Sequence, residues 1–303
     1  MIIFWQIAFI TLIWGYTWVV MKIGLDYFPP FLFSTLRLML GGFLLLVVLR
    51  FFKIPWKPEK KDLKPLFIMG LLMSTGYFGL LTFGMQFVSS GETAVLVYLM
   101  PILVSLLAHY LLGERLTLIK GIGLISGLIG LLFVIGPQAF TYKNSETLLG
   151  QVLILLSALV WAFANIYSKK QFTNYNKEKM TAWQMIMGST LLLILSLFTE
   201  DFSIVQWNGS GILTLLFTGI LSSAAAFAIW FRVLDKIEAS TASMALMLVP
   251  FFGLVFGWLQ LGETFTLYQL IGSTLIFLGI FLVSFQKYAT SQMKYEHTPK
   301  RIN

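Results

Sequence analysis

Long runs of apolar residues alternate with short polar stretches along this chain. Ten of the runs approach the roughly 20 residues that a helix needs to cross a membrane. They cover approximately residues 3–22, 31–49, 66–87, 93–112, 118–136, 149–168, 180–198, 211–234, 242–261 and 267–286. Strands of a membrane β-barrel would appear instead as alternating segments of about 10 residues. The pattern therefore predicts an all-α integral membrane protein with ten transmembrane helices.

One motif occurs twice and divides these runs into two groups of five. The motif L-G-E-x-x-T-L-x-x-x-I-G begins at Leu112 and again at Leu261, 149 positions later. The same offset pairs Gly70 with Gly219, Ser74 with Ser223, Phe78 with Phe227, Pro101 with Pro250, and Gly130 with Gly279. We therefore expect a duplicated five-helix unit, at residues 1–140 and 147–288, followed by a polar cytoplasmic tail at 289–303. Because five is odd, the second unit enters the membrane inverted, a common design in transporters.

The charge of the chain supports a membrane protein and argues against nucleic acid as a partner. Only 11% of the residues are charged and 58% are hydrophobic, whereas soluble domains carry about 25% charged residues. In the ten-helix topology, 18 of the 21 Lys and Arg residues lie on one side. Positive residues collect in cytoplasmic loops. The sequence thus predicts a multi-pass protein of the cell (cytoplasmic) membrane, in contact with the lipid bilayer, with both termini cytoplasmic.

Arg37 is a cation within the second apolar run, where a charge is costly unless it faces protein or water. It is expected about 9 Å from the helix end, at 1.5 Å per residue. Three interpretations are open. The side chain binds an anionic group of a substrate, pairs with an internal acidic residue, or extends to the outer interface.

Several aromatic and polar residues are expected at membrane depth, away from the interfacial belt where Trp usually lies. Together they would suit a solute with both apolar and polar parts, although packing between helices is the alternative for each one alone. The candidate residues are Trp14, Tyr77, Tyr98, Trp161, Asn165 and Trp230.

Two prolines are expected in the middle of predicted helices four and nine. Proline removes a backbone hydrogen bond and bends a helix. The matched placement of Pro101 and Pro250 favours a shared hinge or cavity-lining role over a plain structural kink.

Glycines spaced four residues apart predict close helix contacts. Gly123 and Gly127 form one such pair, and Gly253 and Gly257 form another. Packing within the chain is the favoured interpretation, and a homodimer interface is the alternative.

The sequence lacks the residues that several kinds of chemistry require. It has no cysteine, no phosphate-binding loop of the G-x-x-x-x-G-K-[ST] type, and no Ser/His/Asp set or carboxylate cluster at membrane depth. We expect no enzymatic activity, no metal and no cofactor.

The pattern resembles the EamA type of the drug/metabolite transporter superfamily, over nearly the whole chain. The residues that carry the resemblance are Trp14-Gly15, Lys22, Pro29-Pro30, Arg37, Pro101, Gly113-Glu114, Gly121, Gly123, Pro250, Gly262-Glu263, Gly272 and Gly279. The resemblance implies export or exchange of small metabolites by alternating access. It also implies a substrate cavity between the halves, lined by helices one, three, four, six, eight and nine. The second half departs from the pattern, since Ala162 follows Trp161 and helix seven has no arginine that matches Arg37.

The expected function is therefore secondary transport of a small polar or amphipathic metabolite, with an amino acid or a related compound as the first choice. An anion or nucleotide-sugar exchanger of the same superfamily is the alternative within transport. Outside transport, the alternatives are a membrane-embedded lipid-modifying enzyme and a membrane sensor or scaffold.

Overall fold

The structure is a computed structural model that describes residues 2–87, 93, 96–135, 145–261, 267–268, 270–272, 274–276 and 278–279. Every element within these residues is a helix. The elements are α1 (Ile2–Leu25), α2 (Pro30–Phe51), α3 (Lys60–Gly70), η1 (Leu71–Tyr77), α4 (Phe78–Gly84), α6 (Met100–Leu112), α7 (Leu118–Ile135), α8 (Ser145–Gln171), α9 (Lys177–Thr199), η3 (Phe202–Ile204), α10 (Gly209–Leu216), η4 (Phe217–Ala225), α11 (Ala226–Lys236), α12 (Ala239–Ala245) and α13 (Leu248–Leu261). The predicted tail and half of the predicted tenth helix lie outside the described residues.

Six of the described helical segments are long and apolar enough to cross a membrane. Three of them lie before residue 90 and three between residues 145 and 236. Large apolar side chains on their outer faces remain exposed, such as Phe198 at 85% and Leu213 at 66%. Soluble monomers rarely expose apolar surface on this scale, so lipid is the medium that these faces require. The chain is a multi-pass membrane protein.

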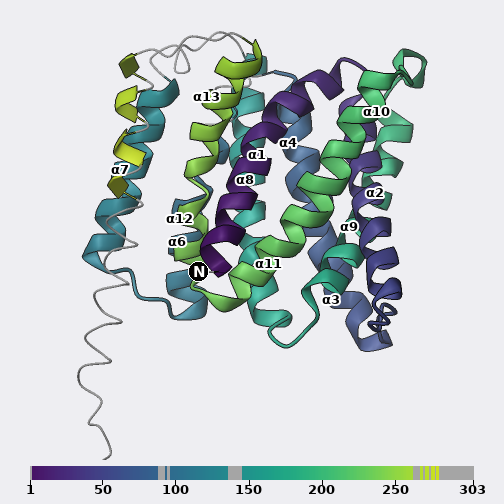
Figure 1. Cartoon of the computed structure of the whole chain (residues 1–303), viewed down its shortest axis with the longest axis horizontal. Coiled ribbons are helices and arrows are strands. Elements are labelled where there is room, and N and C mark those ends of the chain that lie inside the picture. Colours follow the sequence, from purple (N-terminus) through teal and green to yellow (C-terminus); the bar gives the residue numbers. More distant parts are fainter. Residues whose placement is uncertain are drawn as a thin grey trace, which may run out of the picture.

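The helices form a bundle in which segments far apart in the sequence lie side by side (Figure 1). The helix α2 packs against α9 and η4, α1 against α13, and α8 against α4 and α6. We call one end of the bundle the basic end. There α2, α8 and α11 end and α3, α9 and α12 begin. At the opposite end, α1 and α9 end and α2 and α10 begin.

Both prolines singled out from the sequence follow a break in a helix. Turns at residues 98–99 and 246–247 interrupt the predicted helices at 93–112 and 242–261. Pro101 is the second residue of α6, and Pro250 is the third residue of α13. The expectation that they lie mid-helix is therefore wrong. Proline is favoured in the first turn of a helix because the N–H that it lacks would have no helical partner there.

Two helices contain π-helical segments at similar places. The segment η1 joins α3 to α4, and η4 joins α10 to α11. Shifted by 149 positions, residues 71–77 correspond to 220–226, which overlaps η4 at 217–225. Such segments are rare and frequently lie at functional sites.

The predicted glycine faces pack within the chain. A Cβ atom at Gly127 would lie 2.4 Å from Sδ of Met247, and one at Gly15 would lie 3.2 Å from the backbone N of Gly253. A side chain at Gly127 would require Met247 to move, and the contact at Gly15 is tighter than most Cβ contacts. The glycines therefore allow α7 and α1 to approach the α12–α13 region closely, as expected for helix packing in membranes.

The first copy of the repeated motif ends one helix and caps another. Gly113 follows α6 with a φ of +70°, which favours glycine and is common where a helix ends. Glu114 then accepts hydrogen bonds from the backbone N–H groups of Ala239 (2.7 Å) and Ser240 (3.1 Å). These N–H groups belong to the first turn of α12, where a carboxylate is stabilising. Residues 262–266, which contain the second Gly-Glu pair, lie outside the described residues.

Candidate functional site

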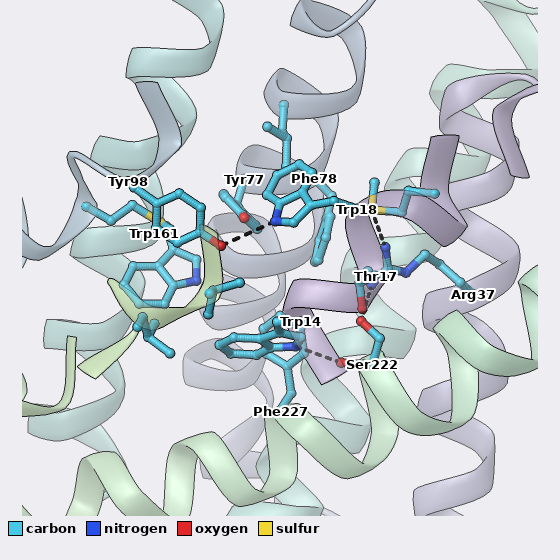
Figure 2. Close-up of a pocket in the computed structure, with 15 residues that line it drawn as sticks. Trp14, Thr17, Trp18, Arg37, Tyr77, Phe78, Tyr98, Trp161, Ser222 and Phe227 are labelled. Atoms are coloured by element: carbon cyan, nitrogen blue, oxygen red, sulfur yellow. Dashed lines mark hydrogen bonds between the residues drawn. The ribbon is translucent and has the colours of Figure 1, made fainter. Parts of the chain in front are cut away.

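A cavity of about 60 Å³ lies where the two π-helical segments and the two helix breaks meet (Figure 2). A single water needs about 10–15 Å³ of such space, so this cavity can hold several waters or a small group of a solute. Its walls come from α1, α2, η1, α4, α6, α8, η4, α11, α13 and the turns before α6 and α13. Five of the residues predicted from the sequence line it: Trp14, Arg37, Tyr77, Tyr98 and Trp161.

Aromatic rings form a continuous wall on one side of the cavity. The ring of Trp14 lies 5.1 Å from that of Phe227, which in turn lies 6.0 Å from the ring of Phe78. The ring of Tyr77 makes an edge contact with Phe78 at 4.8 Å. Trp14 is fixed by a hydrogen bond from Nε1 to the backbone carbonyl of Ser222 in η4, at 3.1 Å. Rings at these spacings interact favourably and give a rigid apolar surface.

Tyr98 lies in the turn before α6 and also faces the cavity. Its hydroxyl accepts a hydrogen bond from Nε1 of Trp18 at 3.2 Å (Figure 2). Trp18 belongs to α1, so this bond ties the first helix break to α1. A rearrangement of the break would therefore alter the cavity wall directly.

Asn165 and Trp230, two further predicted residues, lie behind the wall instead of lining the cavity. Trp230 is fully buried and stacks on Trp161 with ring centroids 5.5 Å apart. Its Nε1 donates to Oδ1 of Asn165 at 2.7 Å, and Nδ2 of Asn165 donates to the carbonyl of Trp161 at 2.7 Å. Because Nε1 of Trp230 and both amide atoms of Asn165 have partners, this pair can stay dry and hold Trp161 in place.

Arg37 lies in the wall at the far side from Trp161 (Figure 2). Its side chain is only 1% exposed, so the interpretation that it extends to the interface is wrong. The guanidinium donates to the hydroxyls of Ser223 (Nε, 3.2 Å) and Ser222 (Nη2, 3.2 Å), and to Sδ of Met21 (Nη1, 3.1 Å). It also lies 5.0 Å from the ring centroid of Phe78.

No acidic residue pairs with Arg37 within the described residues. An arginine at the centre of a membrane helix costs about 2.5–3.5 kcal/mol in insertion measurements. The two serine hydroxyls and the aromatic face offset part of that cost, but none of them carries a negative charge.

Gln184 of α9 is a buried polar residue that the sequence reasoning missed. Its Oε1 accepts a hydrogen bond of 2.8 Å from the hydroxyl of Ser74 in η1. Ser223, which bonds Arg37, lies 149 positions after Ser74. The signal that could have found Gln184 is an offset of 147, which aligns R-L-M-L-G-G at Arg37 with Q-M-I-M-G-S at Gln184.

Sequence reasoning also missed much of the apolar and hydroxyl lining. The additional residues that line the cavity are Thr17, Trp18, Met21, Phe78, Leu81, Met100, Ser222, Phe227, Leu246 and Val249. In an apolar chain most of these types carry no signal of their own. The exception is the matched pair Phe78 and Phe227 at the offset of 149.

A second polar group lies at the basic end. Lys120 donates to Glu238 at 2.6 Å and to the hydroxyl of Ser240 at 3.2 Å. Nζ of Lys169 lies 3.8 Å from Oε1 of Glu114, which also accepts from Ser240 through Oε2. These contacts join the segment between α6 and α7 to the end of α8 and the beginning of α12.

The arrangement offers groups that can bind a solute. In the part of the chain that the structure describes, no group of three or more His, Asp or Glu residues could hold a metal ion. The cavity presents aromatic faces, hydroxyls and one guanidinium. These groups can bind and orient a small solute.

The sequence profile of the EamA-like transporter family matches residues 1–136 and again 148–285. The chain belongs to this family. The chain is also 46% identical over 276 residues to the uncharacterized transporter YoaV of Bacillus subtilis, with 91% of this chain and 94% of the relative covered. The family and the names of these relatives indicate a transporter and not an enzyme.

A second relative and a solved structure extend the comparison. A probable amino-acid metabolite efflux pump of Salmonella typhimurium is 27% identical over 282 residues, covering 90% of this chain and 91% of that protein. A solved crystal structure matches the fold with a TM-score of 0.81 at 19% identity, over 93% of this chain and 96% of the other. At that identity the likeness concerns the fold alone.

Proposed function

We propose that this EamA-like protein is a secondary transporter that exports or exchanges a small polar or amphipathic metabolite. An amino acid or a related compound is the first choice of substrate, consistent with the name of the Salmonella relative. The cavity between Trp14, Arg37, Tyr77, Tyr98 and Trp161 would bind it. Alternating access between two inverted five-helix repeats would move it across the membrane.

Contacts of α7 give the main support for inverted repeats. The hydroxyl of Ser126 donates to the backbone carbonyl of Leu275 at 2.9 Å, and these two positions differ by 149. A residue that contacts its own counterpart is characteristic of a two-fold axis. Phe78 and Phe227 also differ by 149 and contact each other, at a centroid distance of 6.0 Å.

Glycine contacts in the same region are reciprocal. A Cβ atom at Gly130 would lie 2.5 Å from the carbonyl O of Gly272, and one at Gly279 would lie 2.6 Å from the carbonyl O of Gly123. Gly272 and Gly279 follow Gly123 and Gly130 by 149 positions. Two-fold symmetry requires such mutual contacts. They are the observation on which the proposed architecture chiefly rests.

The polar contacts at the basic end support alternating access. Glu114 and Lys120 of the first half bond to Ala239, Ser240 and Glu238 of the second half. These bonds hold the two halves together on that side. These bonds would have to break before the cavity could open toward the basic end. In alternating access, such an opening would occur once in each transport cycle.

The proposed orientation places the basic end in the cytoplasm. Basic residues prefer the cytoplasmic side of a membrane, and Lys120, Lys169 and Lys177 lie at this end. Both termini would then be cytoplasmic, and the membrane would be the cell membrane.

Counterflow in proteoliposomes tests the proposal. Liposomes with the purified protein are loaded with unlabelled amino acids, nucleobases, sugars or organic anions, and uptake of the labelled compound is measured. We expect uptake of an amino acid or a related compound above that of empty liposomes. Thr17→Phe, which fills the cavity, should abolish it, whereas Thr173→Phe on an exposed loop should not. Correctly inserted, folded protein that moves none of these classes would contradict the proposal.

A further inference from the structure

We infer that Arg37 is the anion-binding group of the cavity and that the substrate is a small monocarboxylate with an apolar body. This rests on the proposed transport function and names the substrate class of that same site. Four observations support it. Arg37 has N–H donors without a partner, no described acidic residue pairs with it, the matching position of the other half holds a neutral residue, and the cavity walls are aromatic.

The guanidinium of Arg37 has more N–H donors than the neighbouring side chains accept. Arginine carries five N–H donors, and three hydrogen bonds engage it, to Ser223, Ser222 and Met21. One of these three acceptors is a thioether sulfur, which is weak. Arg37 can therefore offer two or three N–H groups to a ligand. That is the number that a carboxylate takes up in a paired, two-bond contact.

Arg37 also has no negative partner among the residues that the structure describes. Arginine stays protonated in proteins, and this side chain is 1% exposed in the wall of the cavity. Buried charges are generally paired. Among the described residues no carboxylate lies within ion-pair distance of Arg37. Because the cation faces the space where a solute would bind, an anionic group of the solute is the natural counter-ion.

Comparison of the two halves shows that packing here does not require a charge. Arg37 bonds Ser223 on η4, and Gln184 bonds Ser74 on η1. The two serines differ by 149 positions and Arg37 and Gln184 by 147. A neutral amide therefore makes the matching contact between a helix and a π-helical segment in the other half.

The surrounding glycines repeat this correspondence. A Cβ atom at Gly41 would lie 2.9 Å from the carbonyl O of Gly219, and one at Gly188 would lie 2.3 Å from the carbonyl O of Gly70. Gly188 follows Gly41 by 147 positions, as Gln184 follows Arg37. The backbone contact at Gly41 and Gly219 therefore resembles the one at Gly188 and Gly70. Because the second contact is formed beside a glutamine, helix packing alone does not require an arginine at position 37. Gln184 does not line the cavity and Arg37 does.

The walls and the single cation define the rest of the substrate. Trp14, Phe78, Phe227 and Trp161 present aromatic faces that suit an apolar body. One guanidinium balances one negative charge. A phosphate monoester carries about 1.5 to 2 negative charges at pH 7, which would leave charge unbalanced in an apolar surrounding. A monocarboxylate matches the site.

Binding of matched pairs of compounds tests the inference. Tryptophan fluorescence of the purified protein, which has Trp14 and Trp161 at the cavity, is titrated with 3-phenylpropionate and 3-phenylpropionamide. A second pair, phenylalanine and phenylalaninamide, distinguishes amino acids from simple acids as the source of the carboxylate. Charge-assisted hydrogen bonds predict acids that bind about ten- to a hundredfold more tightly than the amides.

The key variant is Arg37→Gln, which installs the residue that the other half uses. It should keep the melting temperature near that of the natural protein and lose the preference for acids. Arg37→Lys keeps the charge without the planar fork and should retain part of the preference. The control Lys22→Gln removes an exposed cation that does not line the cavity, and it should leave the preference unchanged.

Two results would overturn the inference. One is a natural protein that binds the amides as tightly as the acids, and the other is an Arg37→Gln variant that keeps the preference. Should Arg37→Gln fail to fold, an unchanged preference in Arg37→Lys would overturn it and a reduced one would support it. Neither of these results would contradict the proposed transport function. The proposed function fails separately, through the absence of counterflow for every class of compound.

Discussion

Asn165 accepts a hydrogen bond of 2.7 Å from Nε1 of Trp230, and neither side chain reaches the cavity. Their role is indirect. Trp230 stacks on Trp161, and Asn165 also bonds the carbonyl of Trp161. The pair thus positions one cavity residue from behind.

Asn165→Leu removes the acceptor at similar volume and leaves the indole N–H of Trp230 buried without a partner. Such a loss costs about 1–3 kcal/mol. We expect a lower melting temperature in detergent together with weaker substrate binding. Asn174→Leu, at an exposed loop position, is the control and should change neither. A variant of Asn165 with unaltered stability and binding would show that the pair does not support the wall.

Gly188 and Gly70 allow α9 to approach the junction of α3 and η1 more closely than side chains would permit. A Cβ atom at Gly188 would lie 2.3 Å from the carbonyl O of Gly70. Gly188→Ala should therefore destabilise the protein by about 1–3 kcal/mol, as overpacking generally does. Gly121→Ala has nothing within 4 Å and should be neutral or slightly stabilising. Thermal unfolding of the two variants in the same detergent measures the difference, and equal melting temperatures would refute the close contact.

Glu114 joins the two halves at the basic end through Ala239 and Ser240, 3.8 Å from Nζ of Lys169. Glu114→Gln removes the negative charge, so the basic end should open more readily and transport rates should change. Glu59→Gln is the matched control because Glu59 forms an exposed pair with Lys61, and exposed pairs contribute about 0–1 kcal/mol. Labelling of a cavity cysteine from the basic side should increase in Glu114→Gln alone. An equal response of both variants would assign Glu114 no special role.

The proposed topology predicts the sides on which two exposed loop residues lie. Asn174 follows α8 at the basic end and Ser203 follows α9 at the opposite end. The chain contains no cysteine, so single cysteines can be introduced without a background. In intact cells a membrane-impermeant maleimide should label Ser203→Cys and should label Asn174→Cys only after the cells are opened. Labelling of both from outside would exclude this topology.

The apolar pattern was sufficient to predict six long spanning helices, and four aromatic residues predicted from the sequence line the cavity. Trp14, Tyr77, Tyr98 and Trp161 stand out because Trp and Tyr are unusual away from the membrane interface. Arg37 stands out because a charge is rare at that depth. The six long apolar helices follow from the apolar pattern. The family follows from the resemblance that the repeated motif and its neighbouring residues carry.

The helix breaks and the role of Gln184 could not be derived in the same way. A proline predicts a disturbed helix. Where the helix breaks relative to the proline depends on neighbouring contacts, such as the hydrogen bond between Trp18 and Tyr98. Gln184 was not predicted as the counterpart of Arg37 because the two residues align at an offset of 147, whereas the rest of the repeat aligns at 149. Asn165 and Trp230 were placed on the correct helices, but a rotation that a sequence does not specify turned them away from the cavity.

A cysteine in the cavity tests the central claim, that one site opens alternately to the two sides of the membrane. Thr17 lines the cavity on α1, and Thr17→Cys is a small change. In proteoliposomes of known orientation, an impermeant thiol reagent should label this cysteine from either side, and a transported substrate should reduce the labelling from both. Labelling from one side only under every condition, or from neither, would contradict alternating access through this cavity.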